Sequence, residues 1–367
     1  MGSDPSPGGS AGATLALDGL GAEQGPEVVV GAARALAADG IALRVFGRPA
    51  ELAELEGVAG VEVIAAEEAI TNEDDPVSSV RSRPGASVVM AAADVAEGRS
   101  NALVSAGSTG ATMAAALFAL RRMRGVLRPA LGLQIPHPDR RPLLLLDGGA
   151  NSDARAQHLI QFAYLGAAFA EAVLDVANPR VALLSVGEEA KKGTSTVVEA
   201  HDALRDGELN FAGNVEGRDL FTSVADVIVT DGFTGNVVLK TVEGTARAYA
   251  SAIRGAQQLS RRAAVGGRLM RRELDELQEI VEPDTTGGAI LLGLRGVTVV
   301  GHGSSGARGI ENAGRVAARA VNEHAIEQTA RLLSRSGATR AMLRDRRGTE
   351  AGAGHSEVSA PTPTPAK

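Results

Sequence analysis

The sequence predicts a three-layer α/β/α fold built around a mainly parallel sheet. Four times along the chain, a short apolar strand leads into a glycine-rich loop and then into a helix, and this alternation is typical of parallel sheets with helices on both faces. Ala, Val, Leu and Gly must fill the interior, because 44% of the 367 residues are hydrophobic and only 2% are aromatic. The four strand–loop–helix segments are Ala102–Leu120, Leu143–Phe162, Val181–Leu204 and Asp226–Ala248.

The residues before the first of these segments predict three strands and two helices. One helix is expected after Pro26, because proline suits the first turn of a helix. The polar stretch Thr71–Gly85 contains two prolines and predicts a surface loop. Residues 1–14 are rich in Gly, Ser and Pro and predict a disordered N-terminus. The strands are expected at Leu15–Asp18, Ile41–Phe46 and Val61–Ile64, and the second helix near Ser87–Glu97.

The residues after the fourth segment differ in charge from the rest of the chain. Seven arginines and no acid lie in Arg247–Arg272, and six acids follow in Glu273–Asp284. Residues 247–284 are therefore expected to form a helical excursion from the sheet. A last strand and a last helix are expected at Val297–Val300 and Gly309–Ser334.

The overall composition excludes several classes of site and of partner. The chain has no cysteine, which excludes disulfides, thiolate metal sites and a cysteine nucleophile. A net charge of −7 and few aromatic residues argue against a nucleic-acid partner. Without a signal peptide or an apolar run near the ~18 residues of a membrane span, we expect a cytoplasmic protein. The Pro- and Thr-rich residues 337–367 predict a disordered tail and leave residues 15–336 as one α/β domain.

The glycine-rich loops are candidate phosphate sites. Backbone N–H groups at the start of a helix stabilise phosphate or a developing oxyanion, and parallel sheets bind ligands where their strands end. We expect the loops to converge at one edge of the sheet, in an enzyme that handles phosphate. Helix capping by Ser108, Thr109, Asp147 or Asn151 is the alternative explanation for these residues. The candidate phosphate-binding residues are Gly107, Ser108, Thr109, Gly110, Asp147, Asn151, Gly232 and Gly235.

Further polar residues follow the last two of the four strands. Gly187–Thr194 holds two acids and two lysines, and Lys191 or Lys192 is placed to neutralise phosphate or an oxyanion. A solvated charge run is the alternative for this stretch. Asp231 ends an apolar strand, and Asn236 lies where a helix begins.

A dinucleotide-like loop favours a second function. Gly19, Gly21 and Gly25 follow a strand, and Arg48 after the next strand is placed to bind an NADP phosphate. The spacing is one residue longer than in the dinucleotide fingerprint, so a packing turn is the alternative. His302 with Ser304 is interpreted as a turn that opens the last helix. The sequence has no nucleophile elbow, no Walker A lysine and no metal-spaced cluster, so no cofactor and no metal are expected.

Taken together, six strings resemble the bacterial acyl-ACP:phosphate acyltransferases of fatty-acid and phospholipid synthesis. They are SAGSTGA, LDGGAN, VGEEAKKGT, NFAGNVEGRD, DVIVTDGFTGNVVLKTVEG and GHGSS, in order along the chain. The resemblance implies a reaction in which acyl carrier protein delivers an acyl group to inorganic phosphate. It also implies a fold like isopropylmalate dehydrogenase and phosphotransacetylase, a homodimer, peripheral contact with the inner face of the membrane, and a downstream membrane acyltransferase that uses the acyl phosphate.

The resemblance also implies roles for individual residues. Lys192 matches the family's lysine in the acid-rich loop and would hold phosphate or stabilise the tetrahedral oxyanion. Asn214, Asp231 and Asn236 would orient the reacting groups. Direct attack by phosphate is the simpler mechanism, because the ion is already anionic at neutral pH.

The carrier protein is acidic as a class, so a basic docking face is expected on this chain. One candidate is the group Arg121, Arg122, Arg124 and Arg128. The other is Arg247–Arg272, whose interleaved apolar residues are also consistent with contact to anionic lipid. An ordinary solvated helix that pairs with the following acids is the alternative. The candidate contact residues in the second stretch are Arg254, Arg261, Arg262 and Arg268.

The chain departs from the family pattern in several motifs. The family's DAMGGDHAP is DGLGAEQGP here, so Ala22, Glu23 and Gln24 stand where the family usually has Gly, Asp and His. Ser108 replaces an asparagine, and Gly148 replaces a valine. Two alternatives to the acyltransferase stay open. The glycine loop with Arg48 supports an NADP-dependent oxidoreductase of the isopropylmalate dehydrogenase type, and the altered first motif supports a non-catalytic carrier-protein scaffold.

Overall fold

The computed structural model describes residues 12–136, 142–272, 274, 287–335 and 338. The predicted acidic part of the helical excursion, residues 275–284, lies outside the described residues. So do residues 1–11 of the predicted N-terminal tail and almost all of the predicted C-terminal tail.

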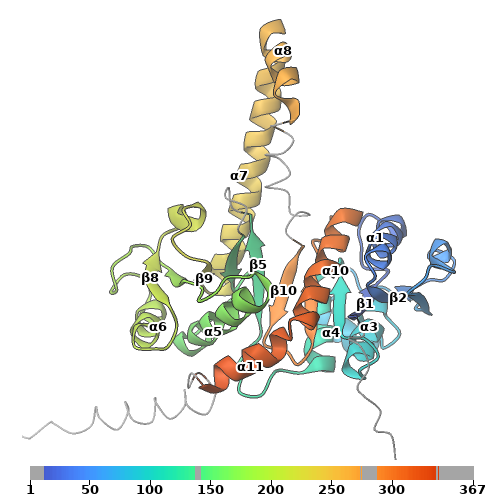
Figure 1. Ribbon diagram of the computed structural model, residues 1–367, viewed down its shortest axis with the longest axis horizontal. Helices are drawn as coiled ribbons and strands as arrows, with labels where there is room; N and C mark the ends of the chain where they lie inside the picture. The colour runs from blue at the N-terminus through green and yellow to red at the C-terminus, as the bar shows by residue number, and fades with distance from the viewer. Residues whose placement is uncertain (1–11, 137–141, 273, 275–286, 336–337, 339–367) are drawn as a thin grey trace, which may run out of the picture.

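The described strands form one eleven-stranded, mainly parallel sheet with helices on both faces, as the sequence predicted (Figure 1). The strand order is β3-β2-β1-β4-β11-β10-β5-β6-β9-β7-β8. The strands are β1 (Thr14–Asp18), β2 (Ala42–Gly47), β3 (Val61–Ala65), β4 (Ala102–Ser105), β5 (Ala130–Ile135), β6 (Leu143–Leu146), β7 (Val181–Leu184), β8 (Phe211–Val215), β9 (Val227–Val229), β10 (Ala289–Leu292) and β11 (Val297–Val300).

The sheet reverses direction at its centre, so the glycine-rich loop after β4 follows a strand that runs opposite to β6, β7 and β9. Strand β10 pairs antiparallel with both β11 and β5, and β5 pairs antiparallel with β6. The parallel groups β3-β2-β1-β4-β11 and β6-β9-β7-β8 therefore run in opposite directions. The prediction of a single carboxyl edge was wrong, because it assumed that all four segments belong to one parallel group.

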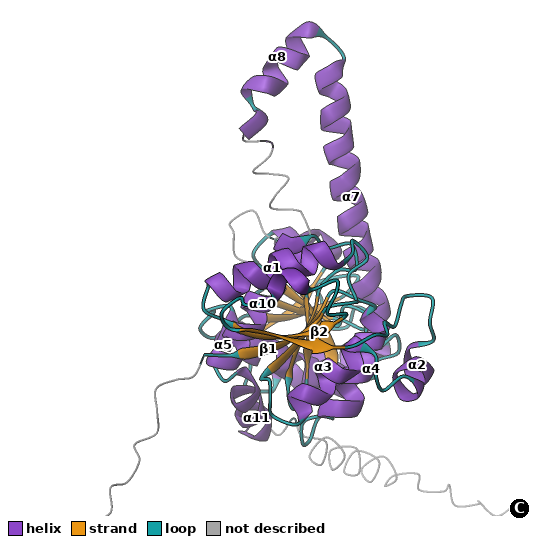
Figure 2. Cartoon of the chain, turned by 90° about the vertical axis from the view of Figure 1, so that its right-hand side faces the viewer, coloured by secondary structure: helices purple, strands orange, loops and turns teal. Residues whose placement is uncertain are grey.

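Two layers of helices enclose the sheet (Figure 2). Helices α1, α5, α6, α10 and α11 pack on one face, and α2, α3, α4 and the start of α7 pack on the other. The helices are α1 (Pro26–Ala38), α2 (Pro76–Ser82), α3 (Ser87–Ala96), α4 (Thr109–Leu120), α5 (Ala156–Val173), α6 (Ser195–Arg205), α7 (Gly232–Gln258), α8 (Arg261–Leu269), α10 (Ala307–Asn322) and α11 (Ala325–Arg335); short 3₁₀ turns lie at Ala53–Leu55 and Gly217–Phe221.

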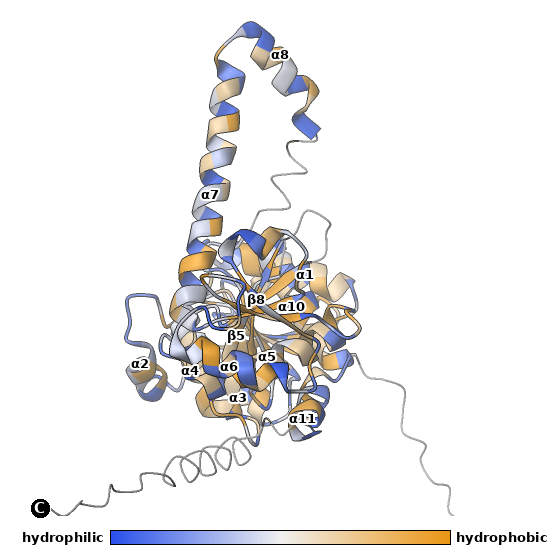
Figure 3. Ribbon diagram, turned by 90° about the vertical axis from the view of Figure 1, so that its left-hand side faces the viewer, coloured by the Kyte–Doolittle hydropathy of each residue, from blue (hydrophilic) through white to orange (hydrophobic). Residues whose placement is uncertain are grey.

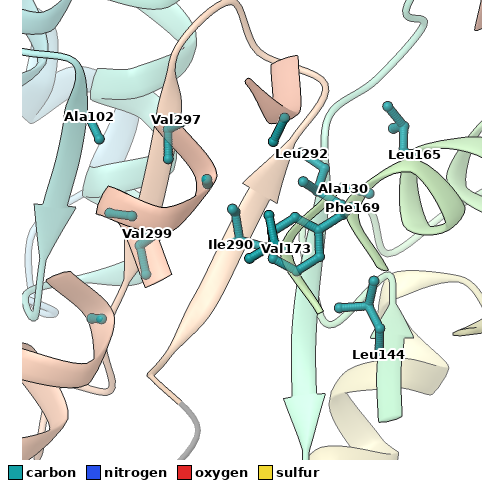
Figure 4. Packing of buried hydrophobic residues seen from close by; sticks show 14 of the residues in the cluster. Ala102, Ala130, Leu144, Leu165, Phe169, Val173, Ile290, Leu292, Val297 and Val299 are labelled. Atoms are coloured by element: carbon teal, nitrogen blue, oxygen red, sulfur yellow. The ribbon is translucent and has the colours of Figure 1, made fainter. Parts of the chain in front are cut away.

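Small residues let the helices approach the sheet closely. Helix α5 is buried along nearly its whole length, and Phe162 and Phe169 are fully enclosed. Figure 4 shows Phe169 and Val173 against residues of β10. At Gly166, a Cβ would stand 2.6 Å from a methyl group of Val227, so glycine is needed for this distance. Burying a Phe or Leu side chain contributes roughly 1.5–3 kcal/mol, which makes this interface a large part of the core.

The polar stretch Thr71–Gly85 is not the continuous loop predicted from its prolines. Helix α2 occupies its middle, with Pro76 at the first helical position. The Asp75 carboxylate accepts a hydrogen bond from the Ser78 N–H at 2.8 Å and caps this helix. The proline begins the helix here, because it has an acidic cap before it.

Helices α7 and α8 form a hairpin that projects from the body of the molecule (Figures 1 and 3). The first turns of α7 pack on the sheet through Val238 and Leu239. Beyond them, apolar side chains such as Tyr249 and Leu259 are exposed. None of the helices in the described ranges has the length and apolarity needed to cross a lipid bilayer.

Candidate active site

A cleft of about 370 Å³ lies over β5, between the ends of β4 and β11 and the first turns of α7. One wall comes from the ends of the first parallel group, and the opposite wall from α7 and the loop after β6. The cleft is lined by Glu23, Asn72, Gly107, Thr109, Leu131, Leu133, Gln134, Ile135, Gly148, Gly149, Asn236, Leu239, Lys240, Val242, Glu243, Gly301, His302 and Gly303, among others.

A buried carboxylate at the end of β1 holds the first loop of the cleft. Asp18 accepts hydrogen bonds from the hydroxyls of Ser87 at 2.5 Å and Ser105 at 2.7 Å. The Ser105 hydroxyl in turn accepts from the Gly107 N–H at 3.1 Å. At Gly21, a Cβ would stand 2.8 Å from the Gly107 Cα, so two glycine backbones meet here. Burial raises the pKa of Asp18, although these hydrogen bonds oppose the shift.

The raised pKa of Asp18 predicts a pH dependence of stability. The ordinary pKa of an aspartate is 3.8, and the pKa of Asp18 in the folded protein is higher. As pH rises above about 4, the carboxyl ionises readily in the unfolded chain but at a free-energy cost in the folded protein, so the free energy of unfolding falls until pH passes the folded-state pKa. In Asp18→Asn this cost is absent. We expect wild type to lose stability relative to Asp18→Asn as pH rises from 4 to 8, measured by denaturant unfolding of both proteins. A difference that stays constant over this range would contradict the prediction.

Two of the four candidate residues in the first loop reach the cleft. Gly107 and Thr109 line it. Ser108 is buried, and its hydroxyl accepts from the Ala111 N–H to cap α4. Gly110 lies against Pro76, because a Cβ added at Gly110 would stand 2.8 Å from the Pro76 Cγ. The cleft therefore meets the positive end of α4 through backbone and Thr109.

Asp147 and Asn151 turn away from the cleft. The Asp147 carboxylate is fully buried and accepts backbone N–H bonds from Leu131, Gly149, Ala150 and Asn151 at 2.7–3.2 Å. The Asn151 amide donates to the same carboxylate and to the Pro129 carbonyl. Burial raises the pKa of Asp147, although these hydrogen bonds lower it in part. Both side chains fix the loop after β6, and this loop presents Gly148 and Gly149 to the cleft.

The start of α7 packs directly on that loop. Asp231 caps the helix by accepting from the N–H and the hydroxyl of Thr234. The Gly232 N–H donates to the Asn151 carbonyl at 2.7 Å. At Gly235, a Cβ would overlap the Asp147 carbonyl oxygen. Gly232 and Gly235 thus allow helix and loop to touch, and they place exposed Asn236 beside Gly149 at the cleft.

Lys192 and Asn214 lie together, but not in the lining of the cleft. Asn214 is buried, and its amide donates to the Glu189 carbonyl at 2.9 Å. The Ser185 hydroxyl donates to the Lys192 carbonyl, and the lysine side chain is exposed. Their strands, β7 and β8, lie beyond β9 from β6, at the far side of the sheet. The proposed roles of these two residues stay predictions.

The cleft contains a lysine that the sequence analysis did not select. Lys240 donates to Glu243 at 3.0 Å, and Glu243 also pairs with Arg247 at 3.2 Å. Among the described lining residues, Lys240 is the sole lysine or arginine. Asn236, Lys240 and Glu243 recur at helical spacing, so they share one face of α7. That helical spacing from Asn236 is the sequence signal by which Lys240 and Glu243 could have been found.

The altered first motif contributes Glu23 to the lining of the cleft. Glu23 accepts from the Asn72 amide at 2.9 Å, and its N–H donates to the Gly303 carbonyl. The Gln24 amide donates to the Ser304 carbonyl at 2.5 Å. His302 lines the cleft, and its Nδ1 lies 2.7 Å from the Ser304 hydroxyl. The substituted residues therefore join the loop after β1 to the loop after β11.

The dinucleotide-like loop is a packing turn in this structure. The Gly19 N–H donates to the Phe46 carbonyl at 2.8 Å, and a Cβ at Gly21 would overlap the Asp18 carboxylate. Arg48 pairs with Glu51 at 2.9 Å and also donates to the Glu67 carbonyl. The glycines of this turn pack against the protein's own backbone and the Asp18 carboxylate, and Arg48 is bonded to Glu51 and to the Glu67 carbonyl.

The two basic candidates for carrier docking lie at different ends of the molecule. The arginines of the 121–128 loop precede the start of β5, away from the mouth of the cleft. Arg254, Arg261, Arg262 and Arg268 are exposed on α7 and α8, which continue outward from the cleft (Figure 1).

Comparison with known proteins places the chain in a family. The family model described as fatty acid synthesis protein matches residues 13–328. A phosphate acyltransferase of Heliobacterium modesticaldum is 44% identical over 319 residues, which cover 85% of this chain and 95% of the relative. A phosphate acyltransferase of Thermobifida fusca is 42% identical over 308 residues, covering 82% of this chain and 85% of the relative.

Solved structures support the fold. A phosphotransacetylase from Streptococcus pyogenes aligns with a TM-score of 0.56 at 19% identity, covering 86% of this chain and 94% of that chain. The EutD phosphotransacetylase from Staphylococcus aureus aligns with a TM-score of 0.54 at 17% identity, covering 84% and 94%. From the family match and the curated relatives together, the chain belongs to the fatty acid synthesis protein family, as a member of its phosphate acyltransferases.

Proposed function

We propose that the cleft transfers a fatty acyl group from acyl carrier protein to inorganic phosphate, for phospholipid synthesis. The observation that carries the proposal is a single cleft with a cationic, hydrogen-bonding part and an apolar wall, in a chain of this family. A phosphate oxygen attacks the thioester carbonyl carbon, and the tetrahedral oxyanion collapses with loss of the C–S bond. The carrier thiolate leaves and takes up a proton, so the products are acyl phosphate and free carrier thiol.

Phosphate is assigned to the polar part of the cleft. The start of α4 supplies the Thr109 hydroxyl and the positive end of the helix dipole on one side, and Gly107 lets the phosphate approach the backbone. Lys240 and the Asn236 amide supply a charge and donors on the other side. Glu243 orients Lys240 through their ion pair. These groups position an ion that needs no activation and stabilise the developing oxyanion.

The other predicted site residues take supporting roles in this proposal. Asp147, Asn151, Gly232 and Gly235 shape the loop and the helix that carry Gly149 and Asn236. Lys192 and Asn214 stay candidates on a separate loop, and the Discussion gives the experiment that compares Lys192 with Lys240.

The acyl chain is assigned to the apolar wall between β5 and α7. Leu131, Leu133 and Ile135 on β5 line the cleft together with Leu239 and Val242 on α7. Apolar side chains on two sides give a hydrocarbon chain contact and exclude water from it.

Leu133 is expected to limit the length of this apolar space. It occupies the volume that a side chain at Gly148 would take. Leu133→Ala removes three carbons from the wall, and each buried methylene is worth about 0.8 kcal/mol. We expect the kcat/KM ratio for stearoyl over myristoyl carrier protein to rise by about tenfold or more. Equal changes for both acyl chains would show that Leu133 does not limit chain length.

The carrier protein is proposed to dock on the α7–α8 hairpin, because α7 runs from the cleft into the hairpin. Reversing four charges (Arg254, Arg261, Arg262 and Arg268 to Glu) is expected to raise KM for acyl carrier protein at least tenfold. The KM for phosphate should stay unchanged, because the cleft is untouched. Arg331→Glu with Arg335→Glu on α11 is the control. An equal effect of the control, or an unchanged KM in the hairpin variant, would count against this docking face.

The hairpin also supports the proposed membrane contact. Tyr249, Leu259, Val265 and Leu269 are 61–84% exposed beside these arginines. Apolar and basic residues together favour binding to anionic lipid. Vesicle sedimentation with and without anionic lipid tests this contact. The homodimer and the downstream membrane acyltransferase stay predictions from the resemblance.

The decisive assay measures release of free carrier thiol as a function of phosphate concentration. We expect thiol release that saturates with phosphate, with acyl phosphate formed in equal amount. Carrier binding without thiol release would support the scaffold alternative, for which the altered first motif is the one argument. The packing turn at Gly19–Gly25 and the bonds made by Arg48 remove the support for the NADP alternative.

A further inference from the structure

A second cavity, of about 680 Å³, lies at the opposite end of strands β4 and β11 from the cleft. Asn101, just before β4, and Val297, the first residue of β11, line it. The ends of α3, α4 and α10 and the start of α11 complete its walls. In Figure 1, α11 lies at the end of the molecule opposite the projecting hairpin. The proposed acyl transfer uses no residue of this cavity.

Two arginines are fixed side by side at this cavity. Arg121 and Arg295 both line it. The Arg295 N–H donates to the Arg121 carbonyl at 3.1 Å, and an antiparallel bridge joins Arg122 to Leu294. Arg121 has φ 61° and ψ 166°, a backbone conformation that is almost confined to glycine. Such a conformation costs roughly 1–3 kcal/mol and recurs at ligand sites.

Neither arginine has an acidic partner within the described part of the chain. The side-chain bond given for this pair runs from Arg295 Nε to the Arg122 carbonyl, at 3.2 Å. The chain has 44 acids and 37 basic residues, so pairing partners are plentiful. Ion pairs hold many other arginines of the body, namely Arg34, Arg44, Arg48, Arg83, Arg99, Arg180, Arg205, Arg218, Arg315 and Arg319.

The donors left over suit a phosphate group. Each guanidinium carries five N–H donors. The carbonyl ends of α3, α4 and α10 lie at this cavity and attract the arginines, so the guanidinium groups must hold an anion against those helix dipoles. Two guanidinium forks match the oxygens of phosphate, and a doubly charged group balances both arginines where a carboxylate would balance one. Asn101 and His324 add polar groups to the lining, whereas the Glu327 carboxylate, which also lines the cavity, repels an anion. The cavity is also larger than a single phosphate ion needs.

We propose that this cavity binds a small phosphate monoester with a polar body, such as a polyol or sugar phosphate, through Arg121 and Arg295. This site is separate from the cleft, because the two lie at opposite ends of strands β4 and β11.

Isothermal titration of the full-length chain with glycerol 2-phosphate tests the proposal. We expect one site that Arg121→Gln with Arg295→Gln weakens at least tenfold. The matched control, Arg122→Gln with Arg124→Gln, removes the same charge from the same loop outside the lining and should change affinity less than twofold. Lys240→Ala, in the cleft, should also leave this binding unchanged.

Three outcomes would overturn the site. They are no binding at millimolar probe, equal weakening by the control pair, and loss of binding in Lys240→Ala with retention in the arginine variant. The variant Arg295→Gln alone keeps the test valid if the double variant unfolds, because Arg295 has no strained backbone to disturb. The binding readout does not depend on the acyltransferase reaction, so failure of one proposal is distinguishable from failure of the other.

Discussion

Lys240→Ala is expected to lower the rate of acyl phosphate formation by about two to three orders of magnitude and to leave the fold intact. Losing one donor to the oxyanion or to a bound phosphate costs about 3–4 kcal/mol in the transition state. Lys240 supplies the sole lysine or arginine side chain among the described residues of the cleft. Initial rates of thiol release at saturating acyl carrier protein, with phosphate varied, measure the effect.

Lys192→Ala is the matched comparison, because the family resemblance gives Lys192 the same role. Lys240 lies on helix α7, whereas Lys192 lies on the loop after β7 and does not line the cleft. If Lys192→Ala lowers the rate by this factor and Lys240→Ala does not, the assignment to Lys240 is wrong and the loop after β7 acts at the reaction centre. Unfolding curves of both variants should match wild type, since both side chains are exposed.

Gly235→Ala is expected to destabilise the protein by at least about 3 kcal/mol, or to prevent folding. An added Cβ would overlap the backbone carbonyl oxygen of Asp147, so the helix or the loop after β6 would have to shift. Overpacking against backbone reaches this size, at the upper end of the usual range for core substitutions. Urea unfolding followed by circular dichroism measures the change.

Gly244→Ala is the control for that substitution. Gly244 is exposed in the same helix, and no neighbouring atom lies within 4 Å of its Cβ position. Alanine at such a helical site is expected to stabilise by about 0.5–1 kcal/mol, because it restricts the unfolded chain. Equal stability of the two variants would mean that the contact between α7 and the Asp147 loop is looser than described.

Local residue patterns predicted much of this molecule. Alternating apolar runs and glycine-rich loops predicted the mainly parallel sheet, most of the helices and every strand except β5, β8 and β10, because each pattern reflects burial on one element. The single helix predicted over Gly309–Ser334 is two helices, α10 and α11. Ordered strings such as TDGFTGNVVLK gave the family, which the comparisons confirm. The cleft was predicted in part, since Gly107, Thr109 and Asn236 reach it.

The tertiary structure alone decided which polar groups face the cleft. Asp147 and Asn151 end an apolar strand as active-site residues do, yet their bonds to nearby backbone turn them inward. The reversal at β10 and β5 comes from pairings between segments far apart in sequence, which no local pattern encodes. The sequence by itself determined the elements and the family, because those depend on short-range periodicity and on motif strings. The direction of each half of the sheet, and the choice of Lys240 over Lys192 as the cation of the cleft, depend on long-range packing.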